Sequence, residues 1–77
     1  MNINERLTAV LAQVFNVPAS EIIQDSSIDN IAKWDSLTHA NLIMSLEQEF
    51  NVSLDALEIV EMLSYKIIAM TLEEKLQ

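Results

Sequence analysis

The chain has 77 residues, of which 51% are apolar, twelve are acidic, four are basic and none is cysteine. We expect a single domain spanning residues 1–77, because a chain this short buries only about 60% of its unfolded surface and needs one efficient core. The lack of cysteine excludes a disulfide framework, a thiolate zinc site and a catalytic thiol, so any thiol chemistry has to arrive on a cofactor.

The net charge of −8 disfavours nucleic acids and anionic membranes, which are bound through Lys and Arg. It predicts partner proteins with basic patches and a salt-sensitive encounter; the alternative is that the charge only keeps a small protein soluble. No apolar run approaches the ~18 residues of a membrane span, and the start of the chain lacks the basic and apolar regions of a signal peptide. We expect a cytoplasmic monomer without membrane insertion.

The spacing of apolar residues predicts a first helix over residues 3–15. Asn2 and Glu5 resemble a capping box at its start. Asn16 is the natural stop in a chain without glycine, because Asn tolerates the left-handed conformation of helix ends. The predicted core residues of this helix are Ile3, Leu7, Val10, Leu11, Val14 and Phe15.

The periodicity breaks down from residue 16 to residue 35, which predicts a long loop containing one helical turn at 19–23. A connection of this length is unusual in a compact domain and is more often functional or held by its own anchors. The expected anchors are the isoleucines of the loop, Ile22, Ile23, Ile28 and Ile31.

Trp34-Asp35-Ser36-Leu37 marks the change from this loop to a second helix over 36–50. Asp35 is a good N-cap, and a phosphate on the hydroxyl of Ser36 would lie beside the free N–H groups of the first turn. The alternative is an ordinary cap followed by a small polar residue.

The second helix carries two sets of residues. Leu42, Ile43, Leu46 and Phe50 follow the spacing of a buried stripe, with Leu37 sealing the first turn, His39 near the edge and Asn51 as the stop. On another face, Ser36, Ala40, Met44 and Glu47 follow one another at steps of three and four residues. Ordinary packing is the alternative for Ala40 and Met44, although an exposed Met suits a surface that meets several partners.

Two further helices follow. Ser53 or Asp55 starts a short third helix with Leu57, Val60 and Met62, and Ser64 caps a fourth. The predicted stripe of the fourth helix is Tyr65, Ile68, Ala69, Leu72 and Leu76. The fold class is therefore all-α: a small four-helix bundle of three longer helices and one short third helix, with a long loop between the first two.

Catalysis and metal binding find little support. Ser36 and His39 are three residues apart, but the presumed cap Asp35 is engaged with backbone N–H groups, and neither a glycine elbow nor a pocket for an oxyanion hole is expected. One histidine without cysteine excludes the common zinc sites, and the acids do not follow a calcium-hand loop.

An Asp-Ser-Leu motif near the middle of a small acidic helical chain, after a long loop, resembles the acyl carrier protein family, including peptidyl carrier proteins, over essentially the whole chain. In that family the motif serine carries a 4′-phosphopantetheine arm. The resemblance implies attachment at Ser36, flanked by Asp35 and Leu37, by a phosphopantetheinyl transferase that uses coenzyme A. It implies a discrete carrier of acyl or aminoacyl thioesters, which is not itself an enzyme.

The resemblance also implies partners and the surfaces that they contact. The partners are acyl- or aminoacyl-loading ligases and acyltransferase or synthase enzymes with basic docking patches. Their recognition residues would be Ala40, Met44 and Glu47, with Glu58 from an acidic flank that comprises Glu47, Glu49, Asp55, Glu58 and Glu61. An acyl chain would enter a slot between the second and third helices, near Leu46, Leu54, Ile59 and Met62; the alternative is that these four residues close the core.

The motif departs from the Gly-Ala-Asp-Ser-Leu-Asp of fatty-acid carriers, because Lys33 and Trp34 precede Asp35 and Thr38 follows Leu37. The Trp-Asp-Ser-Leu form resembles carriers of specialised pathways, such as polyketide, nonribosomal peptide or surface-polysaccharide synthesis. Trp34 is either a partner contact or a plug over the loop. A second hypothesis is an acidic helical adaptor that docks on a basic partner without any prosthetic group.

Overall fold

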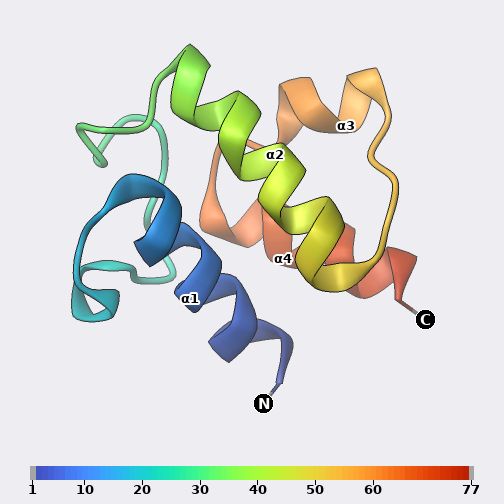
Figure 1. Ribbon diagram of the computed structural model, residues 1–77, viewed down its shortest axis with the longest axis horizontal. Coiled ribbons are helices and arrows are strands. Elements are labelled where there is room, and N and C mark those ends of the chain that lie inside the picture. The colour runs from blue at the N-terminus through green and yellow to red at the C-terminus, as the bar shows by residue number, and fades with distance from the viewer. Residues whose placement is uncertain (1, 77) are drawn as a thin grey trace.

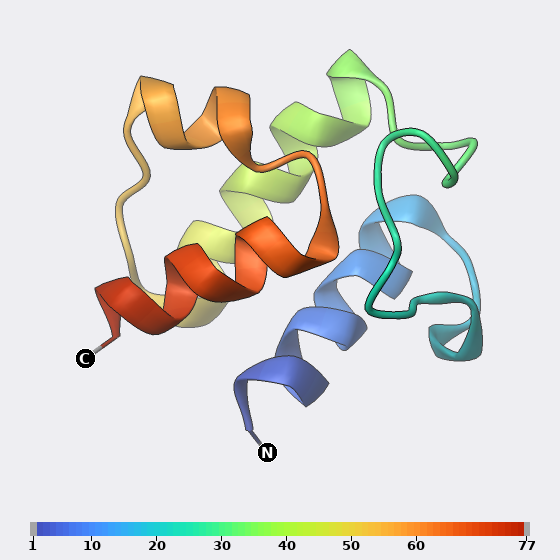
Figure 2. The same ribbon diagram turned by 180° about the vertical axis from the view of Figure 1, so that it is seen from behind.

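The computed structural model describes residues 2–76 and has four α-helices and one 3₁₀ turn. The helices are α1 (Ile3–Phe15), α2 (Ser36–Phe50), α3 (Ala56–Glu61) and α4 (Tyr65–Lys75), and the turn is η1 (Ala19–Glu21). The described residues contain no strand beyond an isolated bridge between Ser27 and Ser64. The prediction of an all-α bundle with a short third helix is confirmed. Figure 1 shows α4 behind α2, and Figure 2, seen from the opposite side, shows α4 in front of α2.

The helix ends follow the local signals in the sequence. Asn2 Oδ1 accepts a hydrogen bond of 2.8 Å from the Glu5 N–H, so Asn2 is confirmed as the cap. The return bond from the Glu5 side chain, which would complete a capping box, is not formed among the described residues. Asn16 (φ 56°, ψ 50°) and Asn51 (φ 54°, ψ 51°) end α1 and α2 in the left-handed conformation. Asn fills here the role that Gly has in most helix ends, because its short polar side chain tolerates positive φ.

One apolar core joins α1, α2 and α4 with the long loop. Its members are the residues whose side chains are almost completely buried: Leu7, Val10, Leu11, Phe15, Ile22, Trp34, Leu42, Ile43, Leu46, Phe50, Leu54, Met62, Tyr65, Ile68 and Leu72. The predicted stripes of the longer helices are therefore confirmed, with Ile3, Val14 and Ala69 packed at the edge. Leu76 is the exception: it is the C-cap after the last residue of α4 and is exposed, which corrects its place in the fourth stripe.

The long loop is held less by its isoleucines than by backbone hydrogen bonds. Ile22 is buried and Ile31 is partly buried, but the predicted anchors Ile23 and Ile28 are exposed, which corrects the expectation for those two residues. The Ile28 N–H donates to the Leu63 carbonyl at 3.0 Å, and the loop also meets the start of α4.

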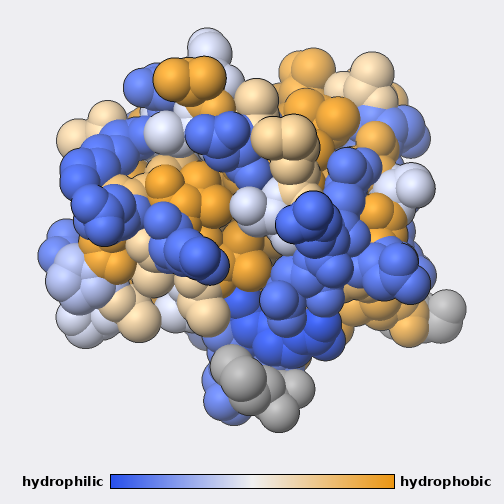
Figure 3. Space-filling view, viewed as in Figure 1, coloured by the Kyte–Doolittle hydropathy of each residue, from blue (hydrophilic) through white to orange (hydrophobic). Residues whose placement is uncertain are grey.

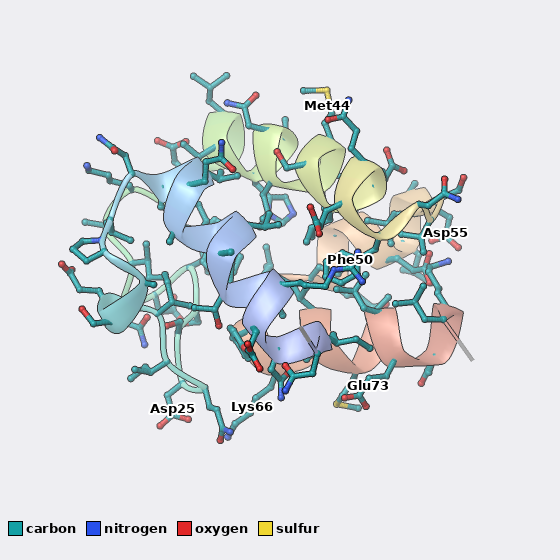
Figure 4. All side chains as sticks on the ribbon, turned by 60° about the horizontal axis from the view of Figure 1, so that its bottom comes forward. Asp25, Met44, Phe50, Asp55, Lys66 and Glu73 are labelled. Atoms are coloured by element: carbon teal, nitrogen blue, oxygen red, sulfur yellow. The ribbon has the colours of Figure 1, made fainter. Side chains whose placement is uncertain are left out.

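Ser26 is the buried polar residue at that meeting point. Its carbonyl accepts from the Tyr65 N–H at 2.8 Å, and its hydroxyl accepts from the Ile23 N–H at 2.8 Å. Asp25 and Lys66, labelled in Figure 4, form an exposed ion pair of 3.3 Å beside it. These bonds satisfy buried backbone groups, which hydrophobic periodicity does not report.

Three large apolar side chains of α2 and α3 are exposed, and one of them was expected to pack. Leu37, which was predicted to seal the first turn of α2, is 73% exposed, because Trp34 fills that part of the core against Phe15, with ring centroids 5.0 Å apart. Leu57 and Val60 lie on the outer side of α3, which contains no buried residue.

Polar contacts hold α3 against the bundle. The Glu47 carboxylate accepts from the Leu54 N–H at 2.9 Å, just before α3. Lys75 Nζ of α4 lies 2.9 Å from the Glu58 carboxylate, and His39 Nε2 lies 2.8 Å from the Ile59 carbonyl oxygen. The position of this short helix therefore depends on side chains of α2 and α4.

Candidate functional site

Ser36 is the first residue of α2, and its side chain is exposed. Asp35 is the N-cap: its carboxylate accepts from the Thr38 N–H at 3.0 Å, while Thr38 Oγ1 accepts from the Asp35 N–H at 2.8 Å. This reciprocal capping box satisfies two free donors of the helix start. The cap at Asp35 is confirmed, and Thr38 is its partner, which the sequence analysis did not identify.

The same threonine fixes the loop before the site. Thr38 Oγ1 donates a hydrogen bond of 2.6 Å to the Lys33 carbonyl, so the three residues before Ser36 are bound to the first turn of α2. The hydrogen bond from the Thr38 N–H keeps the pKa of the Asp35 carboxyl below its ordinary value of 3.8. Asp35 is therefore an anionic cap, and Ser36 has a fixed position with a hydroxyl that faces solvent.

The buried side chain of Trp34 connects this site to the core of the bundle. Its side chain is 3% exposed, and its Nε1–H donates to His39 Nδ1 at 3.0 Å. Since Nδ1 accepts, the proton of the neutral ring lies on Nε2, which donates to the Ile59 carbonyl at 2.8 Å. Of the two interpretations of Trp34, the structure supports the plug over the loop. Because the side chain is buried, it is not a recognition residue on the surface.

The arrangement does not form a serine hydrolase. Both ring nitrogens of His39 are engaged, one by Trp34 and the other by Ile59, so neither activates the hydroxyl of Ser36. His39 is half-buried, as expected for a residue near the edge of the stripe, and its two hydrogen bonds also connect α2 to Trp34 and to α3. Among residues 2–76, no three His, Asp or Glu side chains are grouped to hold a metal ion.

An exposed serine hydroxyl at a helix start, with no hydrogen bond of its own within residues 2–76, fits a covalently attached arm, which needs an accessible oxygen and no pocket. A family model described as "Phosphopantetheine attachment site" matches residues 5–66. The chain belongs to this phosphopantetheine-attachment family. The prosthetic group attached in this family is 4′-phosphopantetheine.

A curated relative agrees with this family. The chain is 37% identical over 51 residues to an acyl carrier protein of Azobacteroides pseudotrichonymphae genomovar. CFP2. The matched stretch is 66% of this chain and 60% of that protein. Among the described residues, no helix has both the length and the apolar character needed to span a membrane.

The structure separates the predicted recognition residues into two groups. Ala40 and Met44 are exposed, and Figure 4 shows Met44 pointing away from the bundle. Glu47 and Glu58 have internal partners: Glu47 binds the Leu54 N–H, and Glu58 binds Lys75 and the Asp55 N–H. These two acids therefore have a structural task that the sequence did not reveal, because their partners lie on other elements or across a cap.

The residues of the expected acyl slot lie between α2 and α3, but most of them are core. Leu46, Leu54 and Met62 are buried members of the single apolar core, and Ile59 is half-buried against it. Leu46, Leu54 and Met62 therefore pack in the core whether or not an acyl chain binds. Ile59 is the member next to the surface, and its carbonyl is held by His39.

Proposed function

We propose that this protein is an acyl carrier, with its 4′-phosphopantetheine arm attached to the hydroxyl of Ser36 and flanked by Asp35 and Leu37. The arm supplies a terminal thiol that holds an acyl or aminoacyl group as a thioester. The protein contributes an accessible oxygen at a fixed place, and its domain spans residues 1–77.

The observation that carries this proposal is the position of Ser36. It lies in Asp35-Ser36-Leu37 as the first residue of α2, exposed, beside a carboxylate that caps the same turn. The match to the phosphopantetheine-attachment family includes this residue. A hydroxyl held at a rigid helix start can be presented to several enzymes in the same way.

The partners of such a carrier are a phosphopantetheinyl transferase, a ligase that loads the acyl or aminoacyl group, and acyltransferase or synthase enzymes. The net charge of −8 supports partners whose docking surfaces carry basic patches. Ala40 and Met44 lie one and two turns along α2 from Ser36 and are exposed, which supports a role in recognition.

We further propose a specialised pathway, such as polyketide, peptide or polysaccharide synthesis, rather than fatty acid synthesis. Support comes from the residues around the motif, which have structural tasks of their own. Trp34 is a core residue before the site, and Thr38 closes the capping box after it. Trp34 and Thr38 are two of the three positions, with Lys33, at which this chain departs from the pattern of fatty-acid carriers.

The test is the intact mass of the purified protein before and after incubation with coenzyme A and a broad-specificity phosphopantetheinyl transferase. We expect a gain of one phosphopantetheine in the wild type and no gain in Ser36→Ala. Ser45→Ala, which removes a half-buried serine of the same helix, is the matched control and should be modified like the wild type.

A wild type that gains no mass, with a transferase that modifies a known carrier, would contradict the proposal and favour the adaptor hypothesis. A gain that persists in Ser36→Ala would move the attachment to another residue. Loss of pathway activity in Ser36→Ala, with unchanged thermal unfolding, would link the arm to function.

A further inference from the structure

A hollow lies between η1 and the residues that precede α2, and we call it the loop pocket. Its volume is about 350 Å³, which is within the range of small-molecule sites in proteins. Apolar residues of both walls line it: Val17, Ile22, Ile31 and Ala32. Both walls lie on the left in Figure 1, and Figure 3 shows apolar and polar side chains mixed on that side of the molecule.

Three polar residues also line the loop pocket, and each has hydrogen-bonding capacity left. Lys33 Nζ uses one of its three donors on the Asn16 carbonyl at 3.4 Å, which joins this wall to the end of α1. The Asn30 amide group uses one N–H and one lone pair within the loop, so another N–H is free. The Glu21 carboxylate has no ion pair among the described residues.

Backbone hydrogen bonds hold the two walls of the loop pocket in place. The Ile22 N–H donates to the Ala19 carbonyl at 3.0 Å and closes η1. On the other wall, the Trp34 N–H donates to the Ile31 carbonyl at 3.0 Å and closes a turn. The pocket is therefore already formed by the fold, as most small-molecule sites are.

An arm attached to Ser36 can reach the loop pocket. The turn over 31–34 keeps its two end Cα atoms within about 7 Å, and the two further residues to Ser36 span at most about 7 Å. The Cα atoms of Ile31 and Ser36 are therefore within about 14 Å of each other. The backbone of a 4′-phosphopantetheine arm has about as many atoms as four to five residues, so it extends roughly 15 Å.

We propose that the loop pocket is the resting place of the 4′-phosphopantetheine arm of Ser36 between transfers. This inference rests on the proposed function. Attachment itself needs no pocket, so the loop pocket acts only on the free length of the arm.

The chemistry of the arm matches the loop pocket. The arm carries two methyl groups on one carbon and several methylenes, which fit the apolar residues of the walls. It also has two amide groups, each with one donor and one acceptor. Lys33 and Asn30 have N–H groups for the arm carbonyls, and Glu21 accepts from an amide N–H of the arm.

The test compares the apo and holo proteins by NMR with methyl-labelled isoleucine. The holo protein is made with coenzyme A and the broad-specificity phosphopantetheinyl transferase. We expect loading to shift the methyl signals of Ile22 and Ile31, and to give nuclear Overhauser effects between them and the two methyl groups of the arm. Ile67, an exposed isoleucine of α4 outside the loop pocket, should not shift.

Ala32→Phe is the variant that fills the loop pocket, because Ala32 is an exposed residue of its wall. Ala56→Phe, at an exposed position where α3 begins, is the matched control. Each variant is compared with its own apo form, so that the effect of the new ring on the shifts cancels. Circular dichroism and thermal unfolding establish that each variant is folded.

We expect the arm in Ala32→Phe to lose its contacts with Ile22 and Ile31, and its methyl signals to move to those of free pantetheine. Ala56→Phe should keep the wild-type contacts. The wild-type comparison needs no variant, and unchanged Ile22 and Ile31 signals in the holo protein would overturn the proposal.

Two other results would also overturn it: arm contacts that persist in Ala32→Phe, and arm contacts in the wild type that involve only α2 and α3. Failure of the proposed function has a different signature, because it is a wild type that gains no phosphopantetheine in the mass measurement.

Discussion

The Nε1–H of Trp34 donates to Nδ1 of His39 at 3.0 Å, and through this histidine the residue before the Asp35 cap is joined to the carbonyl of Ile59 in α3. A buried ring on the loop, the second turn of α2 and the middle of α3 thus share one short chain of hydrogen bonds.

His39→Leu should destabilise the fold by about 1–3 kcal/mol, because it leaves the buried Trp34 N–H and the Ile59 carbonyl without partners. Trp34 is the one tryptophan of the chain, so urea unfolding followed by its fluorescence measures the effect. An unchanged urea midpoint and an unchanged emission maximum would show that the hydrogen bonds of His39 do not contribute to stability.

The stabilising effect of Asp35 should depend on pH. Its folded pKa lies below the ordinary value of 3.8 because the ionised form accepts the Thr38 N–H. The charged form therefore stabilises the fold above about pH 4, and the effect is lost as the pH falls through the folded pKa. Asp35→Asn is a suitable comparison, because Asn also caps helices but does not titrate.

The measurement for Asp35 is thermal unfolding of both proteins between about pH 2 and pH 7. We expect the difference in unfolding midpoint to be constant near neutral pH and to shrink below about pH 4. A difference that stays constant down to the lowest pH would mean that the ionisation of Asp35 does not contribute.

Glu47→Ala should lower the free energy of unfolding by about 1–2 kcal/mol, because it removes the acceptor of the backbone N–H of the buried residue Leu54. Glu61→Ala is the matched control: it removes the same charge at an exposed position on α3 and should change stability by less than about 0.5 kcal/mol. Chemical denaturation measures both variants. Equal losses would indicate that the total charge, rather than the hydrogen bond, is responsible.

If an acyl chain enters the bundle between α2 and α3, loading the arm with a medium-length acyl group should shift the NMR signals of Ile59 and Met62. Ile67 and Met70 of α4 are exposed residues of the same types and serve as internal controls. Shifts confined to Ser36 and its neighbours would contradict the slot and leave these residues with a packing role.

The sequence by itself determined what depends on neighbours along the chain. The bounds of α1 and α2, the Asn stops at residues 16 and 51, and the caps at Asp35 and Ser64 are local and were predicted. Asp55, the cap of α3, is one of the two predicted candidates. The Asp-Ser-Leu motif and its place at a helix start are local as well. The stripes of the longer helices follow from their periodicity, which records which residues share a face.

Only the tertiary structure decided which faces are covered and which polar groups meet. Periodicity did not show that Trp34 takes the space next to Phe15 and leaves Leu37 in solvent, or that α3 buries none of its residues. Long-range partners such as Lys75 for Glu58 come from other elements, so no spacing reports them. Which contacts a side chain makes depends on the residues that the fold places next to it, and the packing of all the helices together determines those neighbours.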